Sequence, residues 1–189
     1  MKTLNHYIKE KLIINKDYVD AHTLTPESFD ELRNIIVDRY NKLGAGTKQN
    51  PIDFNDIDVS NIDSFYNKGI GIFEKTKFKH IDISNWNVSN VKSTICMFYK
   101  CNELESVGDL SNWDVSNVTN MSYMFAFCEK FNQDLSSWDV SNVTNMICMF
   151  YESRSFNQDI SNWDVSKVRF SDGAFTGCSI KIKYQPKFK

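Results

Sequence analysis

The sequence predicts an α/β repeat fold, a right-handed solenoid of about five short strand-helix units behind an N-terminal helical cap. One observation is the string WDVSNVTNM, which occurs at residues 113–121 and again, letter for letter, at residues 138–146. Another is the regular spacing of four tryptophans, Trp86, Trp113, Trp138 and Trp163. A period of about 20 to 50 residues is typical of stacked repeats, in which each unit buries its apolar face against the next.

Apolar residues keep one phase through these units. Counted from each Trp, they recur at positions −3, +2, +5 and +12. A degenerate copy, FNDIDVSNIDSF, precedes them at residues 54–65. Residues 51–178 are therefore expected to form an array of five units, above the roughly three that such an array needs.

Two patterns within a unit predict its elements. In NWDVS and SWDVS, Trp and Val alternate with polar residues, which favours a short strand with Trp and Val facing the core. In MSYMFAFC, residues 121–128, apolar residues at i, i+3, i+4 and i+7 favour a short helix or 3₁₀ stretch. Each unit is thus expected to run through a strand, a turn, a helix and a return loop.

Residues 1–50 are expected to form the helical cap. Thr25 followed by Pro26 is typical of a helix start, and Gly44 is typical of a helix end. These signals predict a helix over residues 26–43, with an apolar stripe that covers the first unit.

Weaker patterns lie at the two ends of the chain. Apolar residues over residues 4–13 suggest a further helix in the cap. In the C-terminal segment, residues 179–189, Ile180, Ile182 and Tyr184 alternate with lysines. This alternation predicts a capping strand whose charges oppose edge-to-edge pairing.

Charge is distributed unevenly along the chain. Residues 51–178 contain 10 basic and 17 acidic side chains, a net charge of −7, whereas the segment after residue 178 carries four lysines. This balance argues against direct nucleic-acid binding, which needs Lys and Arg at the phosphates, and favours a protein partner with a basic surface. A hydrophobic content of 41% without a long apolar run predicts no membrane span.

The N-terminus and the cysteines indicate the compartment. The first 15 residues carry charge throughout and lack the apolar core and cleavage site of a signal peptide, which predicts a cytoplasmic protein. Five cysteines without a CxxC motif argue against a disulfide framework and a structural zinc site. Cys101 and Cys128 share a phase in neighbouring units, so a disulfide and two buried thiols are both open.

The repeat resembles a known family. LSxWDVSNVTNMxxMFxxCxxFNQD, over residues 54–178, is similar to the BspA-like repeat of bacterial surface proteins and lipoproteins, and L-x-x-W-x-V-x-x-V-x-x-M has the layout of a leucine-rich repeat. The resemblance implies a leucine-rich-repeat-like solenoid that binds other macromolecules, with adhesion as the role of secreted members. Because the chain shows no secretion signal, lipobox cysteine or wall anchor, an intracellular binder is expected, and a phage or mobile-element origin would fit.

One candidate surface is a row of Asp and Ser residues. Equivalent positions of stacked strands lie about 4.8 Å apart, so the Asp after each Trp and the Ser two residues later should form ladders. Their side chains could bond to the turn backbone, form an acidic docking face, or hold a cation, although one Asp per unit lacks the oxygen cage that calcium prefers, so no metal is predicted. The docking residues would be Asp58, Asp114, Asp139, Asp164, Ser116 and Ser141.

A second candidate surface consists of residues that break the repeat. Tyr and Arg are favoured as interface anchors, because they combine a large contact area with hydrogen-bonding groups. The residues of this kind near the expected helix surfaces are Tyr99, Tyr123, Tyr151 and Arg154.

No catalytic site or cofactor is predicted. His6, His22 and His80 share no register with a repeated Ser or Cys, so no nucleophile and base can be paired. The sequence has no phosphate-binding P-loop, zinc-protease motif or dinucleotide fingerprint. The chain is therefore expected to be a non-catalytic protein-binding module. Two alternatives stay open: an intracellular inhibitor that offers its acidic surface to a nucleic-acid enzyme, and a fragment of a surface adhesin.

Overall fold

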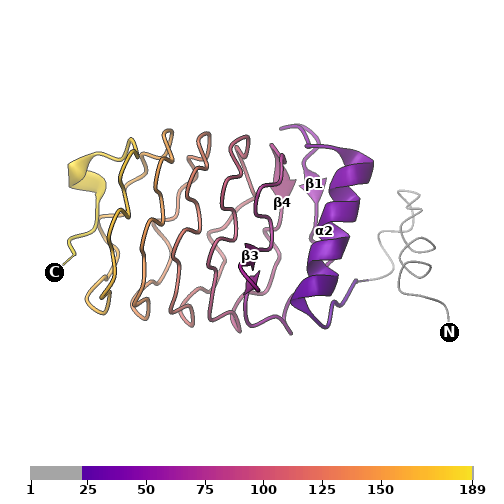
Figure 1. The fold of residues 1–189 in the computed structure, drawn as a ribbon, viewed down its shortest axis with the longest axis horizontal. Coiled ribbons are helices and arrows are strands. Elements are labelled where there is room, and N and C mark those ends of the chain that lie inside the picture. Colours follow the sequence, from indigo (N-terminus) through magenta and orange to yellow (C-terminus); the bar gives the residue numbers. More distant parts are fainter. Residues whose placement is uncertain (1–22, 189) are drawn as a thin grey trace.

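The computed structural model describes residues 23–188, which run as a row of loops from a helix at one end to a short tail at the other (Figure 1). The described elements, in chain order, are α2 (Phe29–Leu43), β1 (Ile52–Asp53), β2 (Tyr66–Asn67), β3 (Ile70–Gly71), β4 (Ile81–Asp82) and the 3₁₀ helix η2 (Ile182–Tyr184). β1 pairs with β4 in parallel, and β2 pairs with β3 as an antiparallel hairpin.

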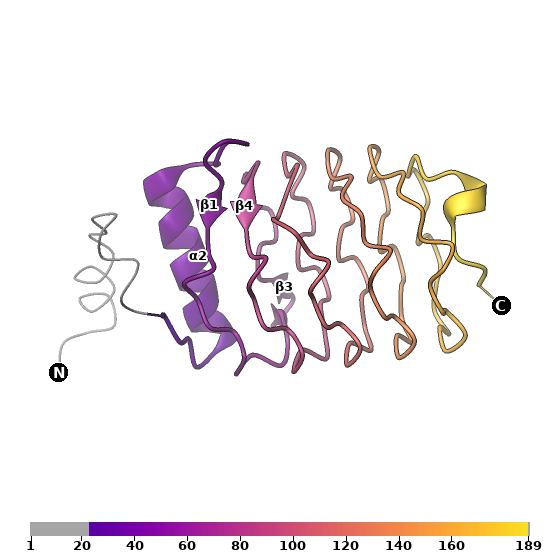
Figure 2. The ribbon, with the colours of Figure 1, turned by 180° about the vertical axis from the view of Figure 1, so that it is seen from behind.

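The prediction of a solenoid of five strand-helix units is wrong. Within residues 23–188, α2 is the one α-helix, and the four strands have two residues each and form two separate two-stranded sheets. The repeats themselves consist of turns and loops. Neighbouring loops lie side by side in both views (Figures 1 and 2), joined by single parallel bridges such as Asn120 to Asn145 and Asn145 to Phe170.

Left-handed backbone explains why MSYMFAFC does not form a helix. Tyr123 and Phe127 have φ values of 57° and 61°, a conformation in which a right-handed helix cannot continue. Their N–H groups donate to the next unit, to Ile147 O at 2.9 Å and Tyr151 O at 2.7 Å. The N–H of Met124, between them, bonds locally to Met121 O at 3.2 Å. The segment is therefore a series of tight turns whose alternate N–H groups reach the next unit.

Side-chain hydrogen bonds explain why WDVS does not form a strand. The Asp114 carboxylate accepts from the N–H of Ser116 at 3.0 Å and from its hydroxyl at 2.6 Å, which closes an Asx turn. The chain therefore bends at the point where the alternation predicts extended backbone. Trp113 and Val115 still face the core, as the alternation predicts, and both are buried.

Stacked rings fill the core from unit to unit. Trp113 and Trp138 lie 6.2 Å apart with ring planes 2° from parallel, and Trp138 and Trp163 lie 6.5 Å apart at 3°. Each indole N–H also donates to a main-chain carbonyl of the preceding unit, as Trp138 Nε1 does to Leu110 O at 3.2 Å. The regular spacing of apolar residues along the sequence thus corresponds to one continuous hydrophobic core.

The N-terminal cap contains the predicted helix with a later start. Helix α2 begins at Phe29 after the N-cap Ser28, whose hydroxyl accepts from Glu31 N at 3.2 Å, so Thr25 and Pro26 lie outside it. Its end at Leu43 is confirmed, because Gly44 has a φ of 77° and donates its N–H to Tyr40 O at 2.8 Å. The helix suggested over residues 4–13 lies outside the described residues.

Two arginines join α2 to the first unit. Arg33 Nη1 donates to Ile72 O at 2.6 Å, and its Nη2 lies 3.4 Å from Glu74 O. Arg39 forms a buried ion pair with Asp56 at 2.6 Å and stacks over the Phe54 ring at 5.0 Å. The guanidinium groups therefore give the first unit the hydrogen-bond donors that a preceding unit would have given it.

The C-terminal segment is not a strand. Residues Ile182–Tyr184 form η2 instead, with Ile182 89% exposed. Of the alternating residues, Ile180 is buried against the core and Tyr184 packs against it in part. Ile160 N donates to Tyr184 O at 3.0 Å, so the segment follows the return side of the last unit.

Candidate functional site

The predicted aspartate row forms turn hydrogen bonds in every unit where it occurs. The Oδ1 atom of each Asp accepts from the N–H of the Ser two residues later, at 2.9 to 3.0 Å. The pairs are Asp58–Ser60, Asp114–Ser116, Asp139–Ser141 and Asp164–Ser166. The interpretation that these side chains bond to the turn backbone is confirmed, while a docking role stays a prediction.

Hydrogen bonding also affects the charge of this row. The side-chain and backbone bonds from Ser60 lower the pKa of Asp58, and those from Ser141 lower the pKa of Asp139. A lowered pKa keeps a carboxyl ionised to more acidic pH. Asp58 and Asp139 are therefore anionic groups that the turns hold in place.

A second aspartate row was not singled out by the sequence. Asp109, Asp134 and Asp159 precede Ser111, Ser136 and Ser161 in the same Asx geometry, with N–H to Oδ1 distances of 2.8 to 3.1 Å. The repeated D-x-S pattern four residues before each Trp was the sequence signal for it. The units of Trp113, Trp138 and Trp163 thus carry two acidic corners each.

The three predicted tyrosines come together in one cluster. Tyr99 meets Tyr123 edge-on at 6.1 Å and Phe127 at 5.8 Å, and Phe127 meets Tyr151 at 5.4 Å. Lys100 Nζ lies over two of these rings, 5.1 Å from the centre of Tyr99 and 5.6 Å from that of Phe127. We call this set, Tyr99, Tyr123, Phe127 and Tyr151 with Lys100, the aromatic patch.

The backbone holds the aromatic patch at the surface. Lys100, Tyr123 and Phe127 all have positive φ values, and their N–H groups are bonded to the next unit. Tyr123 is 38% exposed, and the other members are partly exposed. Sequence reasoning missed Phe127 and Lys100 because an outward-facing Phe cannot be distinguished from a core Phe without knowing that its backbone is left-handed.

Two half-buried thiols flank Tyr123. Cys148 interacts with the Tyr123 hydroxyl and raises the pKa of that phenol, with burial as a further cause. Burial raises the pKa of the Cys96 thiol to about 11. The Tyr123 hydroxyl and the Cys96 thiol are therefore neutral at physiological pH, and Lys100 supplies the ammonium group of the aromatic patch.

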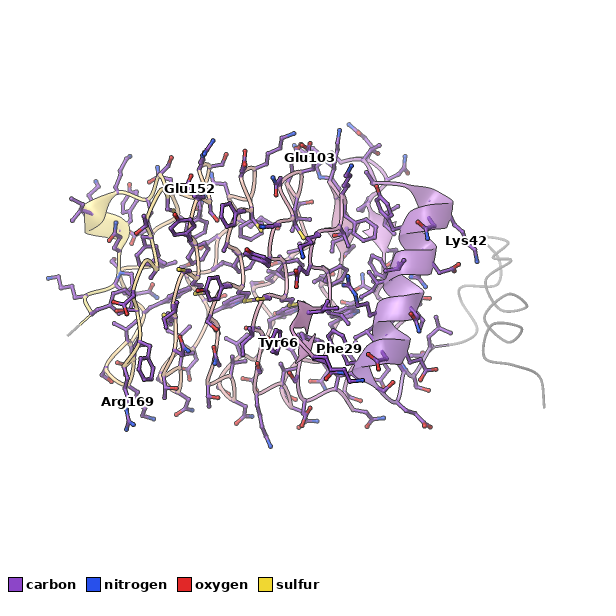
Figure 3. The ribbon with its side chains drawn as sticks, in the orientation of Figure 1. Phe29, Lys42, Tyr66, Glu103, Glu152 and Arg169 are labelled. Atoms are coloured by element: carbon purple, nitrogen blue, oxygen red, sulfur yellow. The ribbon has the colours of Figure 1, made fainter. Side chains whose placement is uncertain are left out.

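Arg154 lies apart from the rings. Its guanidinium bonds to the Glu152 carboxylate at 3.0 and 3.1 Å, and this partner raises the pKa of Arg154. Figure 3 shows Glu152 along the same edge of the row of loops as Glu103, with Arg169 on the opposite edge. Arg154 thus lies near Tyr151 along the chain, and it makes no cation–π contact with the three tyrosines.

The two equivalent cysteines do not form a disulfide. Cys101 and Cys128 are free and fully buried, and each thiol donates to a carbonyl of the preceding unit, Phe73 O and Phe98 O, at 3.0 Å. Burial raises the pKa of Cys101 to about 12. Of the two alternatives, a disulfide or two buried thiols, the structure shows two buried thiols.

One serine and histidine pair does form, which the sequence did not indicate. His80 Nδ1 lies 3.1 Å from Ser106 Oγ, and its Nε2 lies 3.6 Å from the Glu105 carboxylate. His80 and Ser106 also form a parallel backbone bridge, so the ring joins the loop that contains Glu105 and Ser106 to the loop before it. We interpret this contact as a structural tie between loops.

Residues 23–188 contain neither a metal-binding cluster nor a membrane-spanning helix. In that range no three His, Cys, Asp or Glu side chains approach closely enough to hold a metal ion. Over the same residues, no helix has the length and apolar character that crossing a bilayer requires.

Comparison with known proteins gives one match. The model of the family described as Mycoplasma protein of unknown function, DUF285, matches residues 67–185, which is more than half of the chain. Searches of curated proteins and of solved structures give no match.

Proposed function

We propose that this chain, which belongs to the family described as Mycoplasma protein of unknown function, DUF285, is a non-catalytic protein-binding module that holds its partner at the aromatic patch. The observation that carries the proposal is the edge-to-face contact of Tyr99, Phe127 and Tyr151 across three neighbouring units. Kinship with BspA-like repeats, suggested by the WDVSNVTNM string, is consistent with a binding role.

The chemistry of the aromatic patch suits a protein interface. Tyr rings bring large apolar area with few rotatable bonds, and their hydroxyls bond to polar groups of a partner. The rings rest on backbone that is bonded to the next unit, as in the 2.7 Å bond from Phe127 N to Tyr151 O. Little conformational entropy is therefore lost on binding, which favours affinity.

The surrounding charge indicates what kind of partner fits. Residues 51–178 have an excess of seven acidic side chains, and hydrogen bonds from serines lower the pKa of Asp139 in one aspartate row and of Asp159 in the other. A basic or mixed protein surface would approach faster than an acidic one, because opposite charges steer the encounter. The proposed partner is therefore a protein with a basic surface that also offers an apolar or planar group to the rings.

The proposal is tested by comparing variants in a quantitative capture experiment from the native host. Tyr123→Ala combined with Tyr151→Ala should lose a specific protein that the parent chain retains. Phe170→Ala is the matched control, because Phe170 is a 54% exposed ring outside the aromatic patch. Retention of every captured protein by the double variant, or loss with the control instead, would contradict the proposal, provided that the circular dichroism and melting of the variants match the parent.

The two aspartate rows favour a second candidate function, inhibition of a nucleic-acid enzyme by phosphate mimicry. Regularly spaced carboxylates such as Asp114 and Asp139 would occupy a basic groove that normally holds a phosphate backbone. Asp114→Asn with Asp139→Asn keeps the Asx turns, since Asn87 forms the same turn with Ser89. Inhibition that survives this double variant, or binding that does not weaken with added salt, would exclude the mimicry.

A further inference from the structure

One segment of each unit donates main-chain hydrogen bonds to the unit that follows. In this segment, alternate N–H groups of one unit donate to carbonyls of the next, whereas bonds in the opposite direction come from other positions, such as Arg169 N to Thr144 O at 2.8 Å. The last complete set has distances of 2.8 to 2.9 Å and consists of Met146 N to Phe170 O, Cys148 N to Asp172 O, Phe150 N to Ala174 O and Glu152 N to Thr176 O. Along this segment, each unit therefore accepts bonds on one side and donates them on the other.

In the final unit, the N–H groups equivalent to these donors have no acceptor among residues 23–188. Its intervening N–H groups make the usual local bonds, as Ala174 N does to Ser171 O at 3.0 Å and Thr176 N does to Gly173 O at 3.2 Å. The four N–H groups in the donating positions have no acceptor in that range. They belong to Ser171, Gly173, Phe175 and Gly177, and we call this row the donor edge.

The C-terminal segment covers the core beside the donor edge. Phe188 stacks on Phe175 at 6.1 Å and so closes the column of rings, while Lys181 N bonds to Asn157 Oδ1 at 3.0 Å. These contacts follow the interior and the return side of the last unit, at the end that carries the C-terminus in Figures 1 and 2. The four N–H groups take no part in them.

A second copy of this chain is a poor partner for the donor edge. At the N-terminal end, the matching carbonyls of Ile72 and Glu74 are already bonded to Arg33. Two C-terminal ends placed together would bring N–H groups against N–H groups. The complementary surface must instead present a free carbonyl at every second residue, as the turns of residues 170–176 do for the preceding unit.

We propose that the donor edge binds a peptide segment of a partner protein by main-chain hydrogen bonding, with the segment adopting the turn conformation of residues 170–176. The segment takes the place that residues 170–176 take for the preceding unit, so its carbonyls accept from the four N–H groups in turn. Gly173 and Gly177, with φ values of 67° and 71°, keep the left-handed backbone that Tyr123 and Phe127 have in an earlier unit. Main-chain pairing of this kind is a recognised mode of peptide capture.

The test uses a synthetic nine-residue peptide that copies residues 169–177, with both ends blocked, added to the complete chain. Its carbonyls repeat the set that already accepts bonds from Met146 to Glu152. At saturation, amide hydrogen exchange at the donor edge should slow by about tenfold or more, because exchange follows the opening of each bond. The mirror-image peptide, built from D-amino acids, is the matched control and should leave exchange unchanged.

A second variant keeps the result decisive if the short peptide binds too weakly. Repeating residues 154–178 once more before residue 179 adds one unit with an unchanged period. The original four amides should then exchange as slowly as those of Cys148 and Phe150, and the added unit should carry the new rapidly exchanging row. The proposal fails if the original amides stay fast in this variant, or if they are already protected in the unmodified chain, or if the two mirror-image peptides act alike.

Discussion

Replacing Trp138 with Ala should strongly destabilise the chain, because this residue contributes three separate interactions. Its side chain is 3% exposed, its ring stacks on both Trp113 and Trp163, and its indole N–H bonds to Leu110 O. Buried Trp to Ala changes cost about 3–5 kcal/mol. In a chain of 189 residues, each kcal/mol lowers the melting temperature by about 2–4 °C, so the variant should melt roughly 6–20 °C below the parent.

Trp163 provides the matched comparison. It is buried to the same degree and makes the same N–H bond, to Leu135 O at 3.0 Å, but it stacks on one tryptophan instead of two. Trp163→Ala should therefore be less destabilising than Trp138→Ala by about 0.5–1.5 kcal/mol, the value of one aromatic contact. Urea unfolding followed by circular dichroism measures both. Equal losses, or a Trp138 loss below about 1 kcal/mol, would refute the reasoning that stacking between units holds the core.

Three further predictions concern a turn, a carboxylate and two thiols. Lys68→Asn should raise the free energy of unfolding by about 0.5–1 kcal/mol, because Lys68 (φ 48°) precedes Gly69 in a two-residue hairpin loop that favours Asn-Gly, and a drop in melting temperature would contradict this. Asp139→Asn should make unfolding less sensitive to acid: the folded pKa of Asp139 is lowered from 3.8, so its stabilisation is present above that value and is lost as the pH falls through the folded pKa. Urea midpoints at pH 6 and pH 3 should therefore differ less in the variant than in the parent, and equal differences would count against the Ser141 bonds as the cause. Cys101 and Cys128 should react with a thiol reagent only as the chain unfolds, because both are buried and have raised pKa values, and rapid native labelling of either would disprove their burial.

The period and the core could be predicted from the sequence, whereas the backbone of each unit could not. Apolar spacing records which side chains face inward, and tight turns place Met121, Met124 and Phe125 on the same side as a helix would. Spacing does not record the sign of φ, and that sign decides between a helix and turns at Tyr123 and Phe127. Gly173 and Gly177 occupy the same two positions in the last unit, and they were the sequence signal for a positive φ there.

The candidate site was predictable in part for a related reason. Tyrosine residues that depart from the repeat were identifiable as anchors, and the structure brings Tyr99, Tyr123 and Tyr151 into one cluster. The Asp that follows each Trp was identified as a member of a row of aspartates. The bend that its Asx turn introduces was not anticipated, which is why strands were expected at Trp113 and Trp138. Contacts made through left-handed residues such as Lys100 depend on geometry that composition does not encode.

The indole hydrogen bond has a consequence for how such a chain can change over time. Each Trp bonds to the carbonyl at position −3 of the preceding unit, although the residues joined are 32, 30, 28 and 28 positions apart along the array. The indole bond thus keeps the same donor and acceptor positions aligned between neighbours, independently of how many residues lie between them. Insertions and deletions in the intervening loop can therefore accumulate without shifting the rings, so that lineages can vary loop length and surface while the interior stays the same.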